Sequence, residues 1–596
     1  MLLNRDSKNI IFLVIDSLRA DRVGFGDNSA SLTPFLNQLA QKSLVYKNVF
    51  SNGNNTEFAL PGLFSSSHLL DDGGYFSGIA QRGNTLAGTL KKNGYRTAAF
   101  HPLYVRSTSG GYTRGFHDFF HLFDINLFLK EINNTVPWYQ KMFSDGLMTE
   151  VECVDVLIQY FDIYFKEAIS YCHTWLSYSD NPCIPKSLIF KHYEFDAIRD
   201  EFEEEFKYYS RDKYLYVSRV VRGERVGFDH KTGLLCGEPR SFIDIINRAV
   251  RGRIKRSPVG VAEIKFRTIL ARNFFWIWHL SSSYKSAKQA FADALYRVLK
   301  GQQHQVKYLS AGYILQTFKN WLDSNSSDSP FYAYMHLVDG HELNHFSFDL
   351  AGQEKKKKYE LATFRKSLSQ IKHNRRTYRG NILYDTAISY VDSVVKDLFQ
   401  FLEKKGLLNS SIIVITADHG HAYPNVPIRD GVSQQEHFFD DLSHIPLIIS
   451  GSEMPSGQYE NLVSSLDIGP TILDFAGIPA PNSFRGISVK PGACLQRDHV
   501  INENQGRGPC DIERKPLRIC VRTKNYKLVY ECPTGLSADR GIITEIYDLV
   551  SDQKEYENLA GDLAAVESVE SLLEIAKERV KTIRGYVASD PDPLHP

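Results

Sequence analysis

The side chains best suited to chemistry in this sequence follow a hydrophobic run. Residues 411–415 read Ser-Ile-Ile-Val-Ile, and residues 416–420 read Thr-Ala-Asp-His-Gly. The apolar run predicts a buried strand, and the glycine predicts a sharp turn after it. Asp418 and His419 therefore stand side by side at the carboxyl end of a strand. A carboxylate and an imidazole in that place are suited to binding a metal ion.

Two further segments lead to polar side chains that fit this pair. The apolar run at residues 9–15 stops at Asp16, and a strand predicted at residues 45–50 leads through a polar loop to Thr56. Open α/β sheets gather their sites at the carboxyl ends of strands, so we expect these groups to meet. Two carboxylates, an imidazole and a hydroxyl form a ligand set for Zn²⁺ or Mn²⁺, with Ca²⁺ or Mg²⁺ as further candidates and one or two ions. A metal-bound hydroxyl has a lowered pKa and is a usable nucleophile.

The elements around these residues alternate between strands and helices. This alternation predicts an α/β fold with a doubly wound, mostly parallel sheet flanked by helices. Thr33 before Pro34 predicts a helix that begins with a threonine cap. Further strands are expected at residues 95–100, 330–337 and 445–449, and further helices at residues 86–93, 311–323, 379–405, 467–477 and 564–583.

The composition changes along the chain in a way that predicts three parts. Residues 1–118 and 310–490 are expected to form the catalytic core, and residues 491–596 a small α+β subdomain. Residues 119–309 are rich in aromatic and charged side chains and predict a mainly helical insertion. Within it, the basic and aromatic stretch at residues 248–278 has two interpretations: peripheral contact with a membrane surface, or packing of an amphipathic helix on the core, which is the favoured one.

The net charge and the cysteine content indicate which binding partners and which cellular compartment are expected. The formal net charge of +1 over 596 residues predicts no nucleic-acid partner. No signal core and no segment of membrane-spanning length is present in the sequence. Eight cysteines without a C-x-x-C pair predict reduced thiols and a cytoplasmic location. A disulfide among Cys510, Cys520 and Cys532 in an exported form stays an open alternative.

The ordered set of motifs resembles the sulfatase-like branch of the alkaline phosphatase superfamily. The resemblance covers both ends of the chain and omits roughly residues 119–309. It implies a metal-dependent esterase that acts on a small-molecule, glycan or lipid-headgroup ester. The segments that carry it are residues 14–22, 32–36, 49–51, 390–392, 416–420, 444–448, 467–471 and 547–559.

One departure from the sulfatase pattern concerns the nucleophile. Sulfatases carry Cys or Ser in a C/S-x-P-x-R motif and oxidise it to formylglycine. Here the aligned residues 56–65 read Thr-Glu-Phe-Ala-Leu-Pro-Gly-Leu-Phe-Ser, so Thr56 has no such aldehyde product and Leu60 replaces the arginine. The segment is more similar to the threonine motif of phosphoethanolamine and phosphoglycerol transferases. That resemblance implies a covalent phosphothreonine intermediate.

The same resemblance implies roles for individual residues. His341 aligns with a histidine that contacts the substrate phosphate or a second metal, and His437 with a Lys or His that contacts the substrate. Either could protonate the leaving oxygen. Asn55 is a candidate for orienting the substrate, whereas His336 is interpreted as structural and His421 is a minor candidate. The metal ligands implied are Asp16, Thr56, Asp418 and His419.

Three functions are compatible with these residues. The leading hypothesis is a phosphate-ester hydrolase or transferase that acts through Thr56. The first alternative is a sulfuric-ester hydrolase without formylglycine. The second is a catalytically silent protein that binds a partner through residues 119–309; the intact set of metal and nucleophile residues argues against it.

Overall fold

The structure analysed is a computed structural model. It describes residues 8–24, 32–75, 78–102, 108–123, 125–178, 181–185, 195–223, 310–325, 329–341, 377–421, 437–452, 454–493, 496–506, 510–562 and 569–589. The 248–278 stretch interpreted as a membrane or packing helix lies outside the described residues, as does much of the expected insertion.

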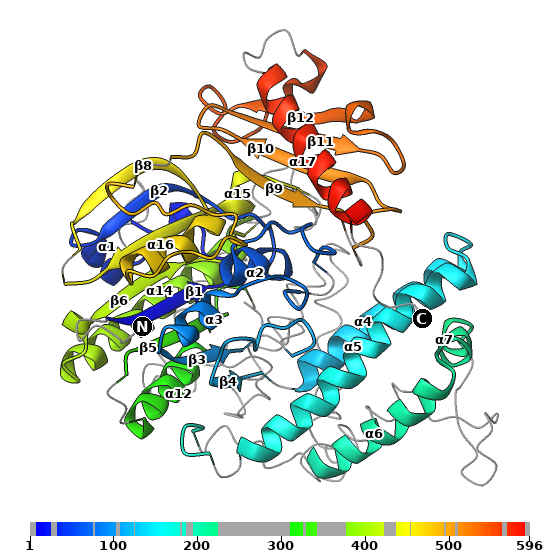
Figure 1. The fold of residues 1–596 in the computed structure, drawn as a ribbon, viewed down its shortest axis with the longest axis horizontal. Helices are drawn as coiled ribbons and strands as arrows, with labels where there is room; N and C mark the ends of the chain where they lie inside the picture. The colour runs from blue at the N-terminus through cyan, green and yellow to red at the C-terminus, as the bar shows by residue number, and fades with distance from the viewer. Residues whose placement is uncertain are drawn as a thin grey trace, which may run out of the picture.

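An eight-stranded sheet forms the centre of the described fold (Figure 1). Its strand order is β4-β3-β5-β1-β6-β7-β2-β8. The apolar, unalternating sequence of β1 suits a strand that is covered on both faces, and six of its seven residues are buried. The strands are β1 (Asn9–Ile15), β2 (Leu44–Phe50), β3 (Arg96–His101), β4 (Asp118–His121), β5 (Phe331–Leu337), β6 (Ser411–Thr416), β7 (His444–Ser450) and β8 (Gly457–Ser464).

Seven of these eight strands run in one direction. Strand β1 pairs in parallel with β5 on one side and with β6 on the other. Strand β7 is the exception, since it is antiparallel to both β6 and β2. The expected doubly wound, mostly parallel sheet is confirmed, and the carboxyl ends of β1, β5 and β6 lie at one edge.

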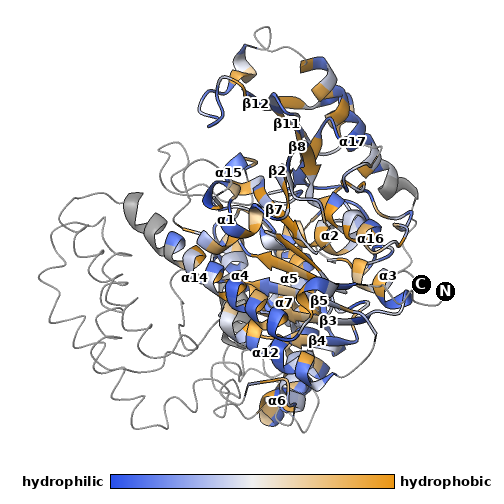
Figure 2. Ribbon diagram, turned by 90° about the vertical axis from the view of Figure 1, so that its left-hand side faces the viewer, coloured by the Kyte–Doolittle hydropathy of each residue, from blue (hydrophilic) through white to orange (hydrophobic). Residues whose placement is uncertain are grey.

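Helices cover both faces of the sheet, as Figure 2 shows from the side. One layer packs α12 (Ala311–Ser324) and α1 (Pro34–Ala40) against the long α14 (Thr377–Lys404). The other layer joins α2 (Thr56–Ser65), α3 (Leu86–Lys92) and α16 (Ile468–Phe475). Short 3-10 helices lie at Ala20–Arg22, Leu408–Ser410, Ser465–Asp467, Ala538–Arg540 and Leu559–Gly561.

The start of α1 differs from the sequence prediction. Pro34 does open the helix, but Thr33 makes no capping hydrogen bond through its side chain. The carboxylate of Asp392 on α14 accepts the N–H groups of Phe35 and Leu36 instead, at 3.0 and 2.8 Å. The helix start is therefore capped by a carboxylate distant in sequence, and not by the neighbouring threonine as predicted.

A group of four helices lies beside strand β4, and all four fall within the expected insertion at residues 119–309. It contains α4 (Ile125–Ser144), α5 (Glu150–Ser177), α6 (Phe195–Arg211) and α7 (Lys213–Val221). Thr149 and Glu152 form a capping box at the start of α5. The sheet continues into this region, because β4 crosses the boundary expected at residue 118 and the N–H of His121 donates to Tyr178 at 2.7 Å.

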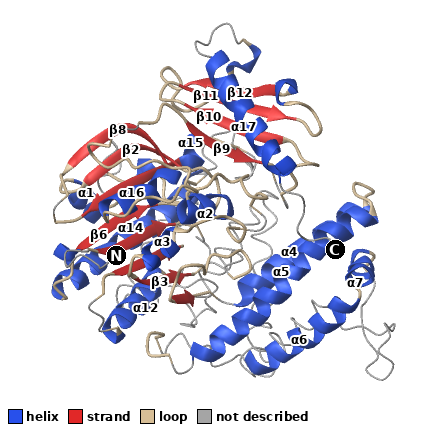
Figure 3. Ribbon diagram, in the orientation of Figure 1, coloured by secondary structure: helices blue, strands red, loops and turns tan. Residues whose placement is uncertain are grey.

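The C-terminal part forms a second, four-stranded antiparallel sheet in the order β12-β11-β10-β9 (Figure 3). A final helix, α17 (Val569–Ser589), packs on β10 and β11. This agrees with the expected α+β composition of the region. The strands are β9 (Val500–Asn504), β10 (Leu517–Arg522), β11 (Tyr526–Cys532) and β12 (Ile542–Asp548).

Candidate active site

Three strand ends bring the predicted ligands together. Asp16 follows β1, while Asp418 and His419 follow β6, the neighbour of β1 in the sheet. All three side chains are fully buried, and one ligand atom from each lies within 4.8 Å of the others. The imidazole Nε2 of His419 is 3.6 Å from Asp16 Oδ1 and 3.5 Å from Asp418 Oδ2. The structure thus brings these three residues to one point.

Thr56 joins this cluster from α2, which lies in the helical layer with α3 and α16. It is the first residue of α2, and its hydroxyl Oγ1 lies 3.4 Å from Asp16 Oδ2 and 3.2 Å from His419 Nε2. The start of a helix carries partial positive charge and unpaired N–H groups. An anionic group at Thr56 would therefore lie at a favourable helix end.

The backbone around the two carboxylates is arranged to hold them. Asp418 Oδ1 accepts the N–H of Ser17 at 3.1 Å and that of His419 at 2.8 Å. Ser17 adopts a φ of 62°, which is unusual for a residue other than glycine. Its hydroxyl donates to Asp16 Oδ1 at 2.8 Å. The left-handed turn after β1 therefore links the two carboxylates through one serine.

The second nitrogen of His419 fixes its tautomer. Nδ1 lies 2.6 Å from the carbonyl oxygen of Gly420, which can only accept a hydrogen bond. Nδ1 therefore carries a proton, and the lone pair of Nε2 faces Asp16 and Asp418. This is the arrangement that a histidine needs to bind a metal through Nε2.

The chemistry of the cluster fits a divalent cation. Asp418 Oδ2 is buried and makes no hydrogen bond to the described residues. Burial raises the pKa of Asp16, but the neighbouring histidines, His341 first, outweigh burial and hold that pKa well below its usual value. Two carboxylates buried at one point need positive charge close by. Asp16, Thr56, Asp418 and His419 are the residues that would hold such an ion.

His336 belongs to this cluster, although the sequence interpretation made it structural. Its Nε2 lies 3.6 Å from Asp16 Oδ2 and 3.7 Å from Asp418 Oδ2, and the side chain is fully buried. Its Nδ1 is 2.9 Å from the hydroxyl of Tyr334. The register of the sheet places it there, because β5 pairs with β1 so that His336 stands opposite Val14, two residues before Asp16. Alternation then puts both side chains on one face.

The three remaining candidate residues lie around this centre. The His341 ring is 6.3 Å from that of His419, centroid to centroid. His437 lies in the segment before β7, and its carbonyl oxygen accepts a hydrogen bond from Asn54. Asn55 caps α2, since its side chain accepts the N–H of Phe58 at 3.1 Å. The Nδ2 group of Asn55 is buried and makes no hydrogen bond to described residues.

His421, the minor candidate, has a different environment. Its ring stacks on Tyr384 with a centroid distance of 5.5 Å. Burial, aided by nearby histidines, lowers the pKa of His421 to about 3. It is therefore a neutral ring at ordinary pH.

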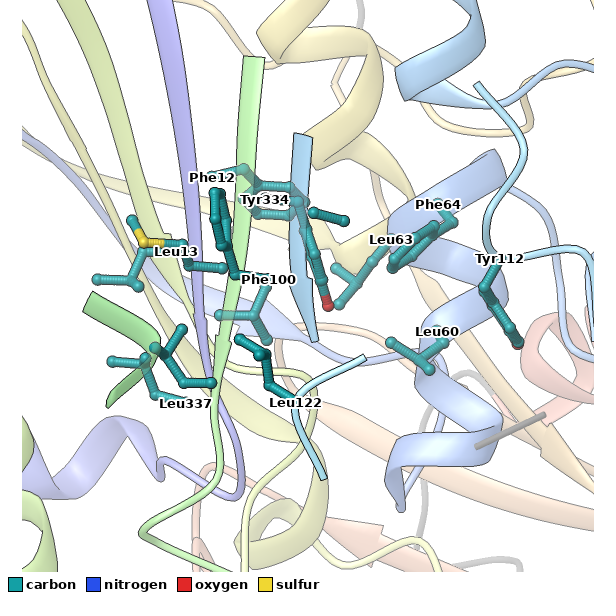
Figure 4. Close-up of a cluster of buried hydrophobic side chains, with 14 of the residues drawn as sticks. Phe12, Leu13, Leu60, Leu63, Phe64, Phe100, Tyr112, Leu122, Tyr334 and Leu337 are labelled. Atoms are coloured by element: carbon teal, nitrogen blue, oxygen red, sulfur yellow. The ribbon is translucent and has the colours of Figure 1, made fainter. Parts of the chain in front are cut away.

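Core packing fixes the helix that begins with Thr56. Figure 4 shows Leu60, Leu63 and Phe64 of α2 among buried side chains of the sheet. The Phe64 ring lies 4.7 Å from that of Tyr334, the residue that contacts His336. Leu60, at the position of the sulfatase arginine, is fully buried. It serves to pack the helix and brings no charge to the site.

Comparison with known proteins identifies the family. A model of the sulfatase family matches residues 8–478, and one of the C-terminal part of N-sulphoglucosamine sulphohydrolase matches residues 431–582. The chain therefore belongs to the sulfatase family, within the alkaline phosphatase superfamily, as the motifs predict.

Curated relatives match over part of their length. An N-acetylglucosamine-6-O-sulfatase of Bacteroides thetaiotaomicron is 28% identical over 228 residues, which are 35% of this chain and 36% of the relative. The N-acetylglucosamine-6-sulfatase of Homo sapiens is 30% identical over 199 residues, which are 28% of this chain and 35% of the relative. The chain thus aligns with only about a third of the length of these relatives.

A solved structure matches the fold over nearly the whole chain. The phosphonate monoester hydrolase of Agrobacterium radiobacter has a TM-score of 0.50 and 14% identity, with 97% of this chain and 95% of the other covered. At this identity the likeness shows the fold alone.

Two further observations concern membrane-spanning helices and the state of the cysteines. None of the described helices has the length and apolar character needed to cross a membrane. Among the described residues, six cysteines are free thiols, including Cys510, Cys520 and Cys532.

Proposed function

We propose that this protein is a metal-dependent hydrolase or transferase that cleaves phosphate esters through a covalent Thr56 intermediate. The observation that carries the proposal is the position of the Thr56 hydroxyl. It lies 3.4 Å from one carboxylate and 3.2 Å from an imidazole whose free lone pair faces it, at the start of α2. A threonine with a purely structural role would not require a carboxylate and an imidazole beside its hydroxyl.

A divalent cation at the cluster would lower the pKa of the Thr56 hydroxyl and offset the charge of the ester. Zn²⁺ and Mn²⁺ suit the mixed oxygen and nitrogen ligands, and Ca²⁺ or Mg²⁺ are further candidates. The α2 helix end adds partial positive charge beside Thr56.

The reaction divides into two displacements at phosphorus. Thr56 Oγ1 loses its proton to solvent and attacks, so that a P–O bond to Thr56 forms and the ester P–O bond breaks. His437 or His341 gives a proton to the leaving oxygen. Water then attacks the phosphothreonine, which restores the Thr56 hydroxyl and releases phosphate. An alcohol in place of water would make the protein a transferase.

A second candidate function is sulfuric-ester hydrolysis without formylglycine. It is favoured by the names of the curated relatives, which are sulfatases. Two relatives are named for N-acetylglucosamine, so a glycan is the first substrate class to test for either ester. The threonine at the nucleophile position favours the phosphate ester, because a phosphothreonine is hydrolysed by the same in-line route that forms it.

The test compares matched aryl phosphate monoesters, phosphate diesters and sulfates, with Zn²⁺, Mn²⁺, Ca²⁺ or Mg²⁺ added to metal-stripped protein. We expect turnover of a phosphate ester and, in acid-quenched samples, the mass of one phosphoryl group on the peptide that contains Thr56. Thr56→Ala should abolish both. Thr89→Ala is the matched control, because Thr89 is also a buried helical threonine and its hydroxyl donates to the Thr85 carbonyl.

Each other outcome rejects a part of the proposal. Full turnover by Thr56→Ala would show that Thr56 is not the nucleophile. Turnover of the sulfate alone would select the sulfuric-ester alternative. No turnover and no bound metal under any condition would favour the silent binding protein.

A further inference from the structure

A short segment, residues 437–442, lies between the sheet that carries the site and the C-terminal sheet. It contains His437 and runs into α15 (Asp440–Ser443). From the core side, Asn54 Nδ2 donates to the His437 carbonyl oxygen at 2.5 Å. Asn54 is two residues before Thr56, so the backbone of His437 is tied directly to the loop of the proposed nucleophile.

The turn that carries the metal ligands holds the same segment. The N–H of Gly420 donates to the carbonyl of Leu442 at 2.7 Å, and that of His421 to the carbonyl of Asp441 at 2.9 Å. Arg19 joins its guanidinium to the Asp441 carboxylate at 2.8 Å. These backbone hydrogen bonds therefore fix the segment against the turn that carries Asp418 and His419.

From the other side, a buried lysine of the C-terminal sheet binds the segment. Lys527 on β11 is 1% exposed. Its Nζ donates to the carbonyl of Phe438 at 2.9 Å and to Asp440 Oδ1 at 2.7 Å, and it also contacts the carboxylate of Glu555. Glu555 in turn accepts the N–H of Asp440 at 2.9 Å. One ammonium group thus fixes the backbone directly after His437.

Charge is balanced within this cluster. Arg522 pairs with Asp440 at 3.0 Å, and its guanidinium lies 3.7 Å from the centre of the Phe50 ring. Burial raises the pKa of Asp440, but the charges of Lys527 and Arg522 overcome this and hold it well below its usual value. Buried ion pairs contribute little net stability compared with apolar packing, and their best-supported use is to specify one arrangement.

The imidazole of His437 is linked to the C-terminal sheet through Phe439. Its ring stacks on Phe439 with a centroid distance of 5.4 Å and an interplanar angle of 4°. Phe439 packs against Tyr547 of β12 and against Leu549. Both the backbone and the ring of His437 are therefore supported by residues more than 80 positions further along the chain.

We propose that Lys527 is a positioning residue that holds His437 in place to protonate the leaving oxygen. The inference rests on the proposed function, and it makes the C-terminal sheet a part of the active site. Lys527 does not touch the substrate in this proposal. It fixes the Phe438 carbonyl and Asp440, and these fix His437.

The experiment measures Lys527→Met on a series of phosphate esters whose leaving groups range from nitrophenol to simple alcohols. A nitrophenolate leaves without a proton, whereas an alkoxide needs one. We expect kcat to fall roughly ten- to hundredfold for the alcohols and little for nitrophenol, the scale at which misplaced catalytic groups act. KM and bound metal should stay near the wild-type values. Lys577→Met is the matched control, because it removes an ion pair of α17 with Asp539.

A double-mutant cycle separates positioning from a general loss of structure. In a His437→Ala background, Lys527→Met should cause no further change in the leaving-group dependence. An equal fall of kcat for every leaving group, or an equal fall in the His437→Ala background, would overturn the inference.

Glu555→Gln serves as the second variant if Lys527→Met does not fold. It keeps the shape of the side chain and weakens one partner of Lys527, so the same selective fall in kcat is expected at smaller size. An unchanged leaving-group dependence in folded Glu555→Gln would then overturn the inference. Thr56→Ala distinguishes this failure from that of the proposed function, because its loss of the phosphoryl adduct does not depend on Lys527.

Discussion

At the scale of single residues, two adjacent buried carboxylates are the feature with the greatest need for compensating charge. Asp16 and Asp418 are both fully buried, and two carboxylates at one buried point need positive charge close by. Asp418 Oδ2 makes no hydrogen bond to the described residues, which indicates where that charge is needed. A bound divalent cation would therefore stabilise the fold as well as supply the chemistry.

Asp418→Asn tests this role of the carboxylate. We expect the variant to bind added Zn²⁺ or Mn²⁺ more than roughly a hundredfold less tightly, since even the loss of a group that only hydrogen-bonds a metal ligand costs ten- to a hundredfold. In excess EDTA its Tm should equal or exceed that of the wild type, because one of two repelling charges is gone. With metal added, the order of the two Tm values should reverse.

Asp392→Asn is the control for this prediction. Asp392 is also a buried aspartate, but its carboxylate caps α1. Its metal affinity should match that of the wild type. The Tm of Asp418→Asn relative to wild type should be higher in EDTA than with metal added. If this relative Tm were instead lower in EDTA, the carboxylate would be a structural group and the metal assignment would be wrong.

The sequence predicted those site residues that follow a strand directly. That Asp16 and Asp418 lie close together could be predicted because each stands at or just beyond the end of an apolar run, and sheet topology brings such ends together. His336 could not be found in this way, since it lies inside β5 and its role depends on the register between β5 and β1. The cap of α1 by Asp392 was missed for a similar reason: 357 positions separate it from Phe35.

At the scale of elements, the loop after β5 is anchored to a helix end. The carboxylate of Asp339 accepts the N–H of Ala311, the first residue of α12, at 2.8 Å. A Cβ atom at Gly340 would lie 2.6 Å from the carbonyl oxygen of Asp16. The loop that leads to His341 is therefore wedged between α12 and the end of β1, which limits where His341 can lie.

The Asp339 anchor predicts a pH-dependent stability. Burial raises the pKa of Asp339 to about 7, above that of the unfolded chain. The stabilisation by the protonated group is complete below about pH 4 and is lost as the pH rises to about 7. Asp339→Asn keeps an oxygen acceptor and has no such loss. We expect its stability relative to wild type to rise by about 1 to 3 kcal/mol between pH 5 and pH 8.

Thermal unfolding at several pH values measures this difference. Asp323→Asn is the control, because Asp323 lies near the exposed end of the same helix and pairs with Lys405. A difference between Asp339→Asn and wild type that is independent of pH would show that Asp339 is ionised throughout.

At the scale of the whole molecule, the sequence-based prediction of the parallel sheet was sound because local patterns carry it. Buried parallel strands are apolar throughout and helices are periodic, so both can be read from short windows. Other features depend on residues far apart in the sequence. The antiparallel course of β7 and the Lys527 cluster are of this kind, and the division into core, insertion and C-terminal subdomain stays a prediction.

A buried arginine of α17 links the C-terminal helix to the core. Arg579 pairs with Asp71, which follows α2, at 2.7 Å and with Glu503 of β9 at 2.7 Å. Glu503 also accepts the N–H of Leu70 at 2.6 Å. The end of the nucleophile helix, the second sheet and α17 therefore share one set of charges.

Arg579→Met should be the most destabilising single change outside the metal cluster. It leaves the carboxylates of Asp71 and Glu503 buried without their main cation, which costs about 3 to 5 kcal/mol. Urea unfolding and protease cleavage near α17 measure this loss. Arg584→Met on the same helix, which removes one bond to the Pro533 carbonyl, should cost about 1 kcal/mol. Equal effects of the two changes would show that α17 is held by its apolar face alone and that the buried charges do not join the two sheets.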